Sequence, residues 1–393
     1  MKPPPGTGYE PIVRPKMPEL DCIRGVAILL VLFYHGFFWS NNVTGLHGIA
    51  KAFVEATRPG WLGVNLFFVL SGFLITGILV DSKNSAHYFR NFYTRRALRI
   101  LPAYYGVLLL LFVSGLRPRA FLILSVVYLS NVTPLFGVAQ AYAVLWSLAV
   151  EEHFYLLWPS VVRSLSRVSL GRCAIAIACV VPALRAASYA AGWRIGLSEY
   201  TWLVADGLAM GAWLATYVRK PGFTRRGLAR VATLAIGVSV VMTLAGARFG
   251  LLTREALLGA AFQESCGNLA FMGAIAATLL IGTGRWQFLM RRPTLKFYGD
   301  ISYGLYLIHL MVFDLYDRVI RRIFPRFENS SGHFRIMTVR FAICLGLATA
   351  LAFLSRRYFE EPFLALKKRF VPATARTRVE SATVSASSNA ATE

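Results

Sequence analysis

Charged residues are scarce in this chain. They make up 16% of its 393 residues, whereas an ordinary soluble domain carries about 25%. Hydrophobic residues make up 56% and gather in stretches of about 17 to 20 residues, each long enough as a helix to cross a hydrocarbon core of about 30 Å. The composition therefore excludes a soluble globular domain and predicts several membrane-spanning helices.

Cysteine is also scarce, and the few cysteines lie in or beside apolar segments: Cys22, Cys173, Cys179, Cys266 and Cys344. They show neither the paired spacing of a metal site nor that of a disulfide framework. We therefore expect no metal site and interpret these cysteines as packing residues.

Acidic residues are outnumbered, with 19 Asp and Glu against 42 Lys and Arg and a net charge of +23. The basic residues lie in short runs between apolar segments, and no charged stretch is long enough to form a basic domain of its own. This distribution excludes nucleic acid as a partner and is typical of the cytoplasmic loops of a membrane protein.

Ten apolar segments have the length of a membrane span. They lie at about 22–40, 61–80, 101–115, 145–162, 173–190, 200–218, 231–247, 267–283, 300–318 and 337–355. An eleventh stretch, 121–137, is apolar but contains Asn131, Thr133 and Pro134. If it does not cross, nearly all the basic loops fall on one side, which the positive-inside rule makes cytoplasmic. The exceptions are Arg321, Arg322 and Arg326.

This pattern predicts an all-α, polytopic integral membrane bundle of about ten helices, and it divides the chain into three regions. Residues 1–19 are Pro-rich and basic, and we expect them to form a cytoplasmic segment. Residues 20–366 hold the spans, and 367–393, rich in Ser, Thr and Ala, are expected to form a disordered cytoplasmic tail. We expect the chain to lie in the cell inner (plasma) membrane, with both termini in the cytoplasm.

The first apolar segment carries two ionisable residues, which cost free energy inside a membrane and therefore indicate function. Arg24 and His35 are eleven residues apart in LDCIRGVAILLVLFYHG, so a helix presents both on one face, about 16 Å apart. Apolar surroundings disfavour the charged form of an imidazole, which leaves it able to accept a proton from a hydroxyl group. The alternative for His35 is an interhelical hydrogen bond without catalytic function.

Arginines cluster in FYTRRALRILPAYY. Arg95 and Arg96 precede Arg99 by four and three residues, so all three side chains gather on one helical face. Guanidinium groups bind phosphates through paired hydrogen bonds, and the cluster is a candidate phosphate site. Anchoring at the cytoplasmic membrane surface is the alternative.

Two adjacent carboxylates lie in VLWSLAVEEHFYLLWP. Ser147, Glu151 and Tyr155 follow at intervals of four and are expected to share a face, with Glu152 and His153 pointing elsewhere. The carboxylates could orient an imidazole, pair with an arginine or hold a substrate hydroxyl. An ion pair that only fixes helix packing is the alternative.

Two weaker patterns occur in other apolar segments. GVNLFFVLSGFLIT contains Asn65, Ser71 and Gly72, and ISYGLYLIHL places Ser302, Tyr306 and His309 on one helical face. Small and hydroxyl residues in spans mostly serve helix packing. We expect His309 to line a site at most.

Taken in order, these segments resemble the membrane-bound acyltransferase-3 family, whose members O-acylate surface polysaccharides, lipopolysaccharide, Nod factors and macrolides. The resemblance runs from about residue 19 to 365 and includes EEPF at 360–363. It implies a bundle of about ten helices that binds acyl-CoA from the cytoplasm and passes the acyl group to an acceptor on the far side. Arg24 and His35 match the Arg and His of the family's first span, and Arg96 and Arg99 match its R-x-x-R motif. The chain departs from the family at His153, where many relatives carry Gln, and at VADGLAMG (204–211), which lacks an Arg often found before the Asp.

The resulting hypothesis is an acyl-CoA-dependent O-acyltransferase, with acetyl as the expected acyl group and no tightly bound cofactor. The expected partners are acyl-CoA, a carbohydrate or glycolipid acceptor, and membrane lipid. His35 is the expected general base, and an acyl-histidine intermediate is the mechanistic variant. The candidate residues are His35, Arg24 and Glu151 for catalysis, Arg95, Arg96 and Arg99 for acyl-CoA, and Ser71, Ser147, Glu152 and His309 for the acceptor.

Two other classes of protein stay open. A transporter would also place ionisable residues on span faces, although no internal repeat is present in the sequence. A scaffolding membrane protein would leave the cost of the buried charges without a purpose.

Overall fold

The computed structural model describes residues 11–14, 16–39, 45–194, 196–284, 286–323 and 334–366. Within these ranges all regular structure is helical, so the all-α prediction is confirmed. Residues 1–10, the predicted tail 367–393 and Arg326 lie outside the described residues.

The helices follow one another along the chain. They are α1 (Pro18–Phe33), η1 (Tyr34–Trp39), α2 (Gly48–Thr57), η2 (Arg58–Leu62), α3 (Gly63–Asp81), α4 (Tyr88–Val113), α5 (Arg119–Val126), η3 (Thr133–Phe136), α6 (Leu145–Ser164), α7 (Arg167–Ala190), α8 (Thr201–Tyr217), α9 (Arg225–Ala247), α10 (Leu257–Gly282), α11 (Gln287–Met290), α12 (Pro293–Ile323), α13 (Phe334–Leu354), η4 (Ser355–Glu360) and α14 (Glu361–Leu366).

Seven helical stretches of the described chain are long and apolar enough to cross a membrane, which makes this a membrane protein. They contain α1, α3, α4, α7, α9, α10 and α13. Each of the ten predicted segments coincides with a helix, but α8 has only 17 residues, and α6 and α12 carry charged residues along their length. The count of ten spans therefore stays a prediction.

The doubtful segment 121–137 does not form a spanning helix. It contains the end of α5, which has 8 residues, and the short turn η3. At about 1.5 Å per residue, α5 is about 12 Å long and cannot cross a hydrocarbon core of about 30 Å.

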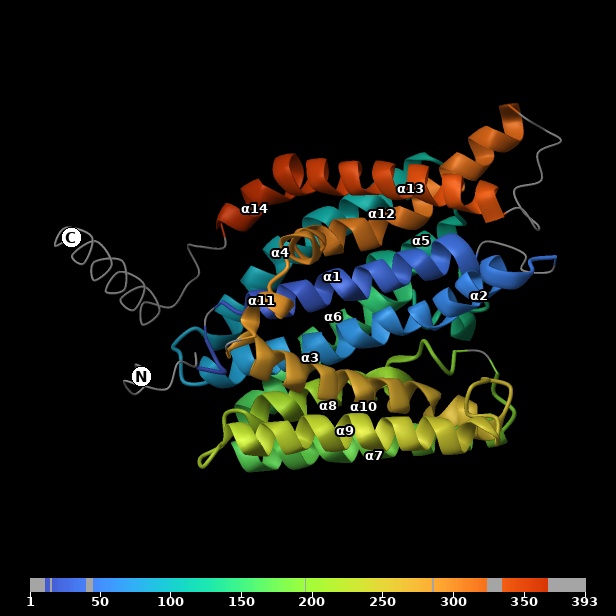
Figure 1. Cartoon of the computed structure of the whole chain (residues 1–393). Helices are drawn as coiled ribbons and strands as arrows, with labels where there is room; N and C mark the ends of the chain where they lie inside the picture. Colours follow the sequence, from blue (N-terminus) through green and yellow to red (C-terminus); the bar gives the residue numbers. More distant parts are fainter. Residues whose placement is uncertain are drawn as a thin grey trace, which may run out of the picture.

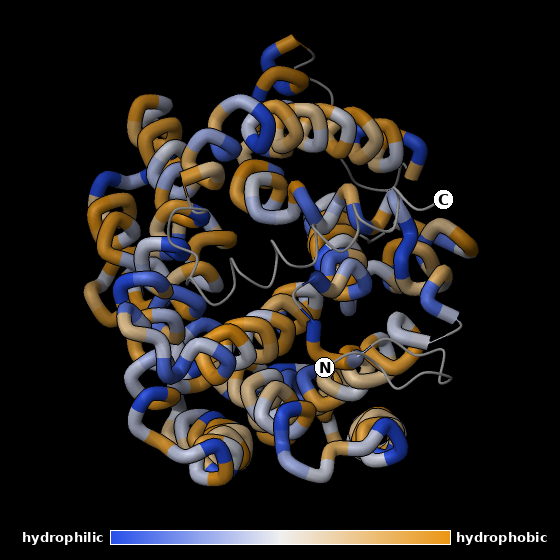
Figure 2. The backbone as a smooth tube through the Cα atoms, turned by 90° about the vertical axis from the view of Figure 1, so that its left-hand side faces the viewer, coloured by the Kyte–Doolittle hydropathy of each residue, from blue (hydrophilic) through white to orange (hydrophobic). Residues whose placement is uncertain are grey.

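The long helices run side by side in a layered bundle. In Figure 1, α7, α8, α9 and α10 form the lower part, α1 and α3 cross the middle, and α12 and α13 form the upper part. Figure 2 looks along the helices and shows hydrophobic colouring along their length, with the hydrophilic colouring mainly in the segments that connect them. Large apolar side chains on the outside of the bundle, such as Leu234, Val241 and Leu244 of α9, are exposed. In a membrane these side chains contact lipid rather than water.

Glycines allow close contact between the helices that build the site. A Cβ atom on Gly72 of α3 would lie 2.0 Å from the carbonyl oxygen of Leu208 in α8, and one on Gly25 of α1 would lie 2.0 Å from that of Leu295 in α12. A Cβ atom cannot lie so close to a carbonyl oxygen, so only glycine allows the two helix backbones to approach this closely, as is common between membrane helices. The contacts fix α1 against α12 and α3 against α8.

The first span changes its geometry at the candidate histidine. The α-helix α1 ends at Phe33 and continues as the π-helix η1, which contains His35. Single π turns are rare and occur frequently at functional sites.

Candidate active site

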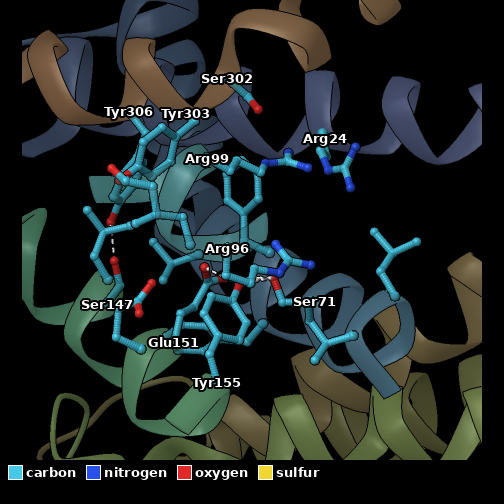
Figure 3. A pocket seen from close by; sticks show the side chains of 18 residues that line it. Arg24, Ser71, Arg96, Arg99, Ser147, Glu151, Tyr155, Ser302, Tyr303 and Tyr306 are labelled. Atoms are coloured by element: carbon cyan, nitrogen blue, oxygen red, sulfur yellow. Dashed lines mark hydrogen bonds between the residues drawn. The ribbon is translucent and has the colours of Figure 1, made fainter. Parts of the chain in front are cut away.

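A cavity inside the bundle brings together residues from five helices. Its empty volume is about 790 Å³, including the part open to solvent. Its polar lining comes from α1, α3, α4, α6 and α12: Arg24, Ser71, Arg96, Arg99, Ser147, Glu151, Glu152, Tyr155, Ser302, Tyr303 and Tyr306. We call it the arginine cavity. In the view of Figure 3, Arg24 and the guanidinium group of Arg99 lie toward one side, and Tyr306 and Ser147 lie toward the other.

The arginines of this cavity differ in their partners. The Nη1 atom of Arg24 lies 2.5 Å from Oδ1 of Asp21 and forms an ion pair with it. The guanidinium group of Arg96 lies 5.0 Å from the ring centre of Tyr155, a cation–π contact. Among the residues that the structure describes, no carboxylate oxygen lies within 4.0 Å of a guanidinium nitrogen of Arg96 or Arg99. Two cations thus face a cavity without a protein anion in direct contact, an arrangement that suits an anionic ligand.

The carboxylate of Glu151 is held from two sides. Ser71 Oγ donates a hydrogen bond to Oε1 at 2.8 Å, and the Tyr155 hydroxyl donates one to Oε2 at 2.9 Å. Both bonds are drawn in Figure 3. The predicted meeting of Ser147, Glu151 and Tyr155 on one face is confirmed, since all three line the arginine cavity.

The prediction that Glu152 points away from these residues was wrong, because Glu152 lines the same cavity. Adjacent residues on a helix are about 100° apart, and the cavity is wide enough to meet both glutamates. His153 does point elsewhere, and its Nδ1 atom lies 2.7 Å from Oγ1 of Thr201.

Arg95 is not among the residues that line the arginine cavity. Its Nε atom donates to the backbone oxygen of Asn91, one turn earlier in α4, at 2.9 Å. The structure thus separates the predicted arginine cluster into Arg96 and Arg99, which reach the cavity, and Arg95, which does not.

A second cavity contains His35. Its empty volume is about 730 Å³. Five tyrosine and tryptophan side chains and several polar groups line it: Tyr34, Trp39, Trp61, Trp146 and Tyr306, with His35, Asn65, Ser198, Glu199, Arg254 and Glu264. We call it the histidine cavity. Arg24 and Glu151 line the arginine cavity instead, so the three predicted catalytic residues lie in two compartments.

His35 and His309 form a pair. Nε2 of His309 lies 3.3 Å from Nδ1 of His35, and His309 is fully buried. Nδ1 of His309 lies 2.8 Å from the backbone oxygen of Tyr306, which can only accept, so this nitrogen carries the proton and Nε2 of the neutral ring accepts.

The same reasoning assigns the proton of His35. Its Nδ1 atom lies between two acceptors, Nε2 of His309 and the backbone oxygen of Val31 at 3.0 Å. Nδ1 therefore carries the proton, and Nε2 is the basic nitrogen of the neutral imidazole. The sequence pattern allowed His309 at most a place in the lining of a site. Among the described residues it lines neither cavity, and it contacts His35 from behind the lining.

Two residues line both cavities, Val64 of α3 and Tyr306 of α12. The hydroxyl of Tyr306 lies 2.6 Å from Oγ of Ser147, a residue of the arginine cavity. The compartment of the arginines and the compartment of the histidine are therefore separated by a layer of side chains.

Apart from Asn65, the polar residues of the histidine cavity outside α1 and η1 were not predicted from the sequence. Arg254 packs 4.3 Å from the ring centre of Trp61 and lies 3.3 Å from Oε1 of Glu264. Oε2 of Glu264 contacts the fully buried Arg185, which also pairs with Asp206. Arg185 and Asp206 lie inside the predicted spans 173–190 and 200–218. A charged residue inside a span needs a partner, so these two residues were the signal in the sequence that pointed to this network.

Arg185 also accounts for the difference from the family pattern in the segment VADGLAMG (204–211). The segment lacks an arginine before Asp206, but Arg185 of α7 brings a guanidinium group to that carboxylate at 3.0 Å. The charge on Asp206 is therefore compensated from another helix.

Comparison with known proteins gives a consistent picture. The model of the family described as an acyltransferase domain matches residues 17–357. The peptidoglycan O-acetyltransferase OatA of Listeria monocytogenes is 32% identical over 167 residues, 37% of this chain and 24% of the relative. The putative peptidoglycan O-acetyltransferase YrhL of Bacillus subtilis is 36% identical over 163 residues, 36% of this chain and 23% of the relative. A putative O-acetyltransferase of Staphylococcus aureus is 31% identical over 170 residues, 38% of this chain and 25% of the relative.

The aligned part thus spans about a quarter of the length of these relatives. No solved structure matches the chain.

Proposed function

The chain belongs to the acyltransferase domain family, and on that premise we propose that it transfers an acyl group from acyl-CoA to a hydroxyl group of a carbohydrate or glycolipid. Acetyl is the proposed acyl group, because the relatives are named O-acetyltransferases. The observation that carries the proposal is the adjacency of two cavities, one with arginines that suit phosphates and one with a histidine that suits a base.

The arginine cavity is the proposed site for acyl-CoA. Coenzyme A carries a pyrophosphate and a 3′-phosphate, and Arg96 and Arg99 offer guanidinium groups that no carboxylate of the described chain contacts directly. Arg24 adds a third cation, and Glu151, fixed by Ser71 and Tyr155, balances part of this charge. Arg95, turned away from the cavity, is left out of this proposal.

The histidine cavity is the proposed site for the acceptor. Its tyrosine and tryptophan side chains offer flat apolar faces against which sugar rings can pack, and Glu199 and Glu264 can accept hydrogen bonds from hydroxyl groups. The names of the relatives support a glycan acceptor of the cell envelope.

The proposed reaction uses His35 as the general base. Nε2 takes the proton from the acceptor hydroxyl, and the oxygen attacks the thioester carbon. The new C–O bond forms as the C–S bond breaks, and the departing CoA thiolate receives the proton that His35 holds. His309 keeps His35 in the required tautomer through the contact at 3.3 Å between their rings.

The basic loops support a placement in the cell inner membrane with both termini in the cytoplasm. This placement gives the arginine cavity access to cytoplasmic acyl-CoA and leaves the acceptor on the far side.

Reconstitution tests the proposal. The purified protein in proteoliposomes is incubated with radiolabelled acetyl-CoA and chitotetraose, and the products are separated and identified by mass spectrometry. We expect acetylated sugar and free CoA from the wild type and neither from His35→Ala. Accumulation of unreacted label inside the liposomes would indicate a transporter and contradict the proposal.

A further inference from the structure

The two cavities adjoin where they share lining residues, and we call this place the boundary. Of all the residues that line them, only Val64 and Tyr306 of the described chain belong to both. Both side chains are largely buried, and they come from two different helices, α3 and α12. This shared lining marks the place where the two cavities adjoin.

A hydrogen-bonded chain closes this boundary. Ser147 Oγ lies 3.2 Å from the backbone oxygen of Val144, which can only accept, so the serine donates to it. The hydroxyl of Tyr306 then donates to Ser147 Oγ at 2.6 Å. Ser147 lines the arginine cavity and Val144 lines the histidine cavity, so the chain runs across the boundary. Figure 3 shows the bond between Tyr306 and Ser147.

The hydroxyl group of Tyr306 does not hold the histidine pair in place. His309 is held by the backbone oxygen of Tyr306, not by its hydroxyl. Removal of the hydroxyl group therefore breaks one hydrogen bond, to Ser147, and keeps the contact of the tyrosine ring with the ring of His309, whose centres are 5.8 Å apart.

We propose that Val64, Ser147 and Tyr306 form an aperture through which the acyl group of acyl-CoA reaches His35, and that its width sets the length of the acyl chain. The inference rests on the proposed function, because it assumes a donor in the arginine cavity. An acetyl group places one methyl group in the aperture, whereas each further methylene has to fit between Val64 and Tyr306. One methylene in an apolar site changes specificity by about 10-fold to 200-fold.

Substitution of Val64 tests the proposal in both directions. Val64→Ala widens the aperture and Val64→Leu narrows it, while Tyr306→Phe removes only the hydrogen bond to Ser147. Val69→Ala is the matched control, because Val69 lies in the same helix, is fully buried and lines neither cavity. Proteins that elute as single species from size exclusion are compared in proteoliposomes with acetyl-, propionyl- and butyryl-CoA and chitotetraose. CoA release, which also counts transfer to water, gives kcat/KM for each donor.

We expect Val64→Ala to raise the ratio of butyryl to acetyl kcat/KM about tenfold or more and Val64→Leu to lower the propionyl to acetyl ratio. Tyr306→Phe should raise the ratio of butyryl to acetyl kcat/KM by about threefold, because one hydrogen bond is lost. Ratios within twofold of the wild type in all three variants, or an equal change in Val69→Ala, would overturn the aperture and leave the proposed function intact. Absence of CoA release from every donor by the wild type would instead contradict the proposed function itself.

Discussion

Two regions of this bundle bury arginine together with carboxylates, and they differ in what the guanidinium groups contact. Arg185 of α7 is fully buried, and its nitrogens bond to Asp206, Glu264 and Ser265. It also donates to the backbone oxygens of Leu203 and Ala261. In the arginine cavity, by contrast, Arg96 and Arg99 have no carboxylate of the described chain within 4.0 Å.

This difference in contacts distinguishes an arginine that stabilises the fold from arginines that are available to bind a ligand. A buried charge that is fully paired and hydrogen-bonded fixes the helices around it, and removal of one partner leaves the others without compensation. A charge that faces a cavity without such partners leaves its hydrogen-bonding capacity for a ligand. We therefore expect substitutions in the Arg185 network to change stability, and substitutions in the two cavities to change activity.

The largest effect is expected for His35→Ala. Loss of the general base should lower kcat for acetyl transfer by about a thousandfold, with no change in the midpoint of thermal unfolding in detergent. His47→Ala, at an exposed histidine, is the control. Activity of His35→Ala within tenfold of the wild type would remove His35 from the mechanism.

Arg185→Leu should lower the stability of the fold, in contrast to His35→Ala, which should lower activity alone. It leaves Asp206 and Glu264 buried without their shared cation and should lower the free energy of unfolding by about 3 kcal/mol or more. The midpoint of thermal unfolding is measured beside that of Arg172→Leu, a substitution at an exposed arginine of the same helix. If the two variants unfold at the same temperature, the network does not stabilise the fold.

Arg96→Lys and Arg99→Lys should weaken the binding of acyl-CoA. Lysine cannot form the paired hydrogen bonds of a guanidinium group with phosphate, so KM for acetyl-CoA should rise by about tenfold. Acetylpantetheine lacks the phosphates, and its kcat/KM should stay unchanged in the same variants. Arg90→Lys, at an exposed position of α4, is the control. An equal loss with both donors would show that the arginines do not act on phosphate.

A smaller effect than for His35 is expected at His309, which acts through His35. His309→Leu removes the acceptor that fixes the tautomer and should lower kcat by about tenfold with little change in KM. His309→Gln keeps an acceptor oxygen and should restore part of the rate. Equal rates in the two variants would make the role of His309 one of packing only.

The fold was predictable because its signals are local. Apolar stretches of spanning length and the runs of arginine between them predicted the helices, and the i, i+4 pattern predicted that Ser147, Glu151 and Tyr155 share a face. The site was predictable where a charged or hydroxyl-bearing residue stood out in an apolar segment. Arg24, Arg96, Arg99 and the two glutamates of α6 were found in this way, and all line one cavity.

The remaining features depend on contacts between distant segments. Whether Arg95 or Arg99 reaches the cavity depends on the rotation of α4 against its neighbours, which the spacing of the arginines does not determine. The pairing of His35 with His309, 274 residues apart, and of Arg185 with Glu264, 79 residues apart, likewise arises only from helix packing. The boundary at Val64 could not be found in the sequence, because a valine in an apolar segment carries no signal.

A structure determined with bound CoA would test the central claim most directly. We expect phosphate oxygens within hydrogen-bonding distance of the guanidinium groups of Arg96 and Arg99, with the thiol end of the pantetheine at Val64 and Tyr306, facing His35. CoA bound outside the arginine cavity, or with its thiol turned away from the boundary, would contradict the account.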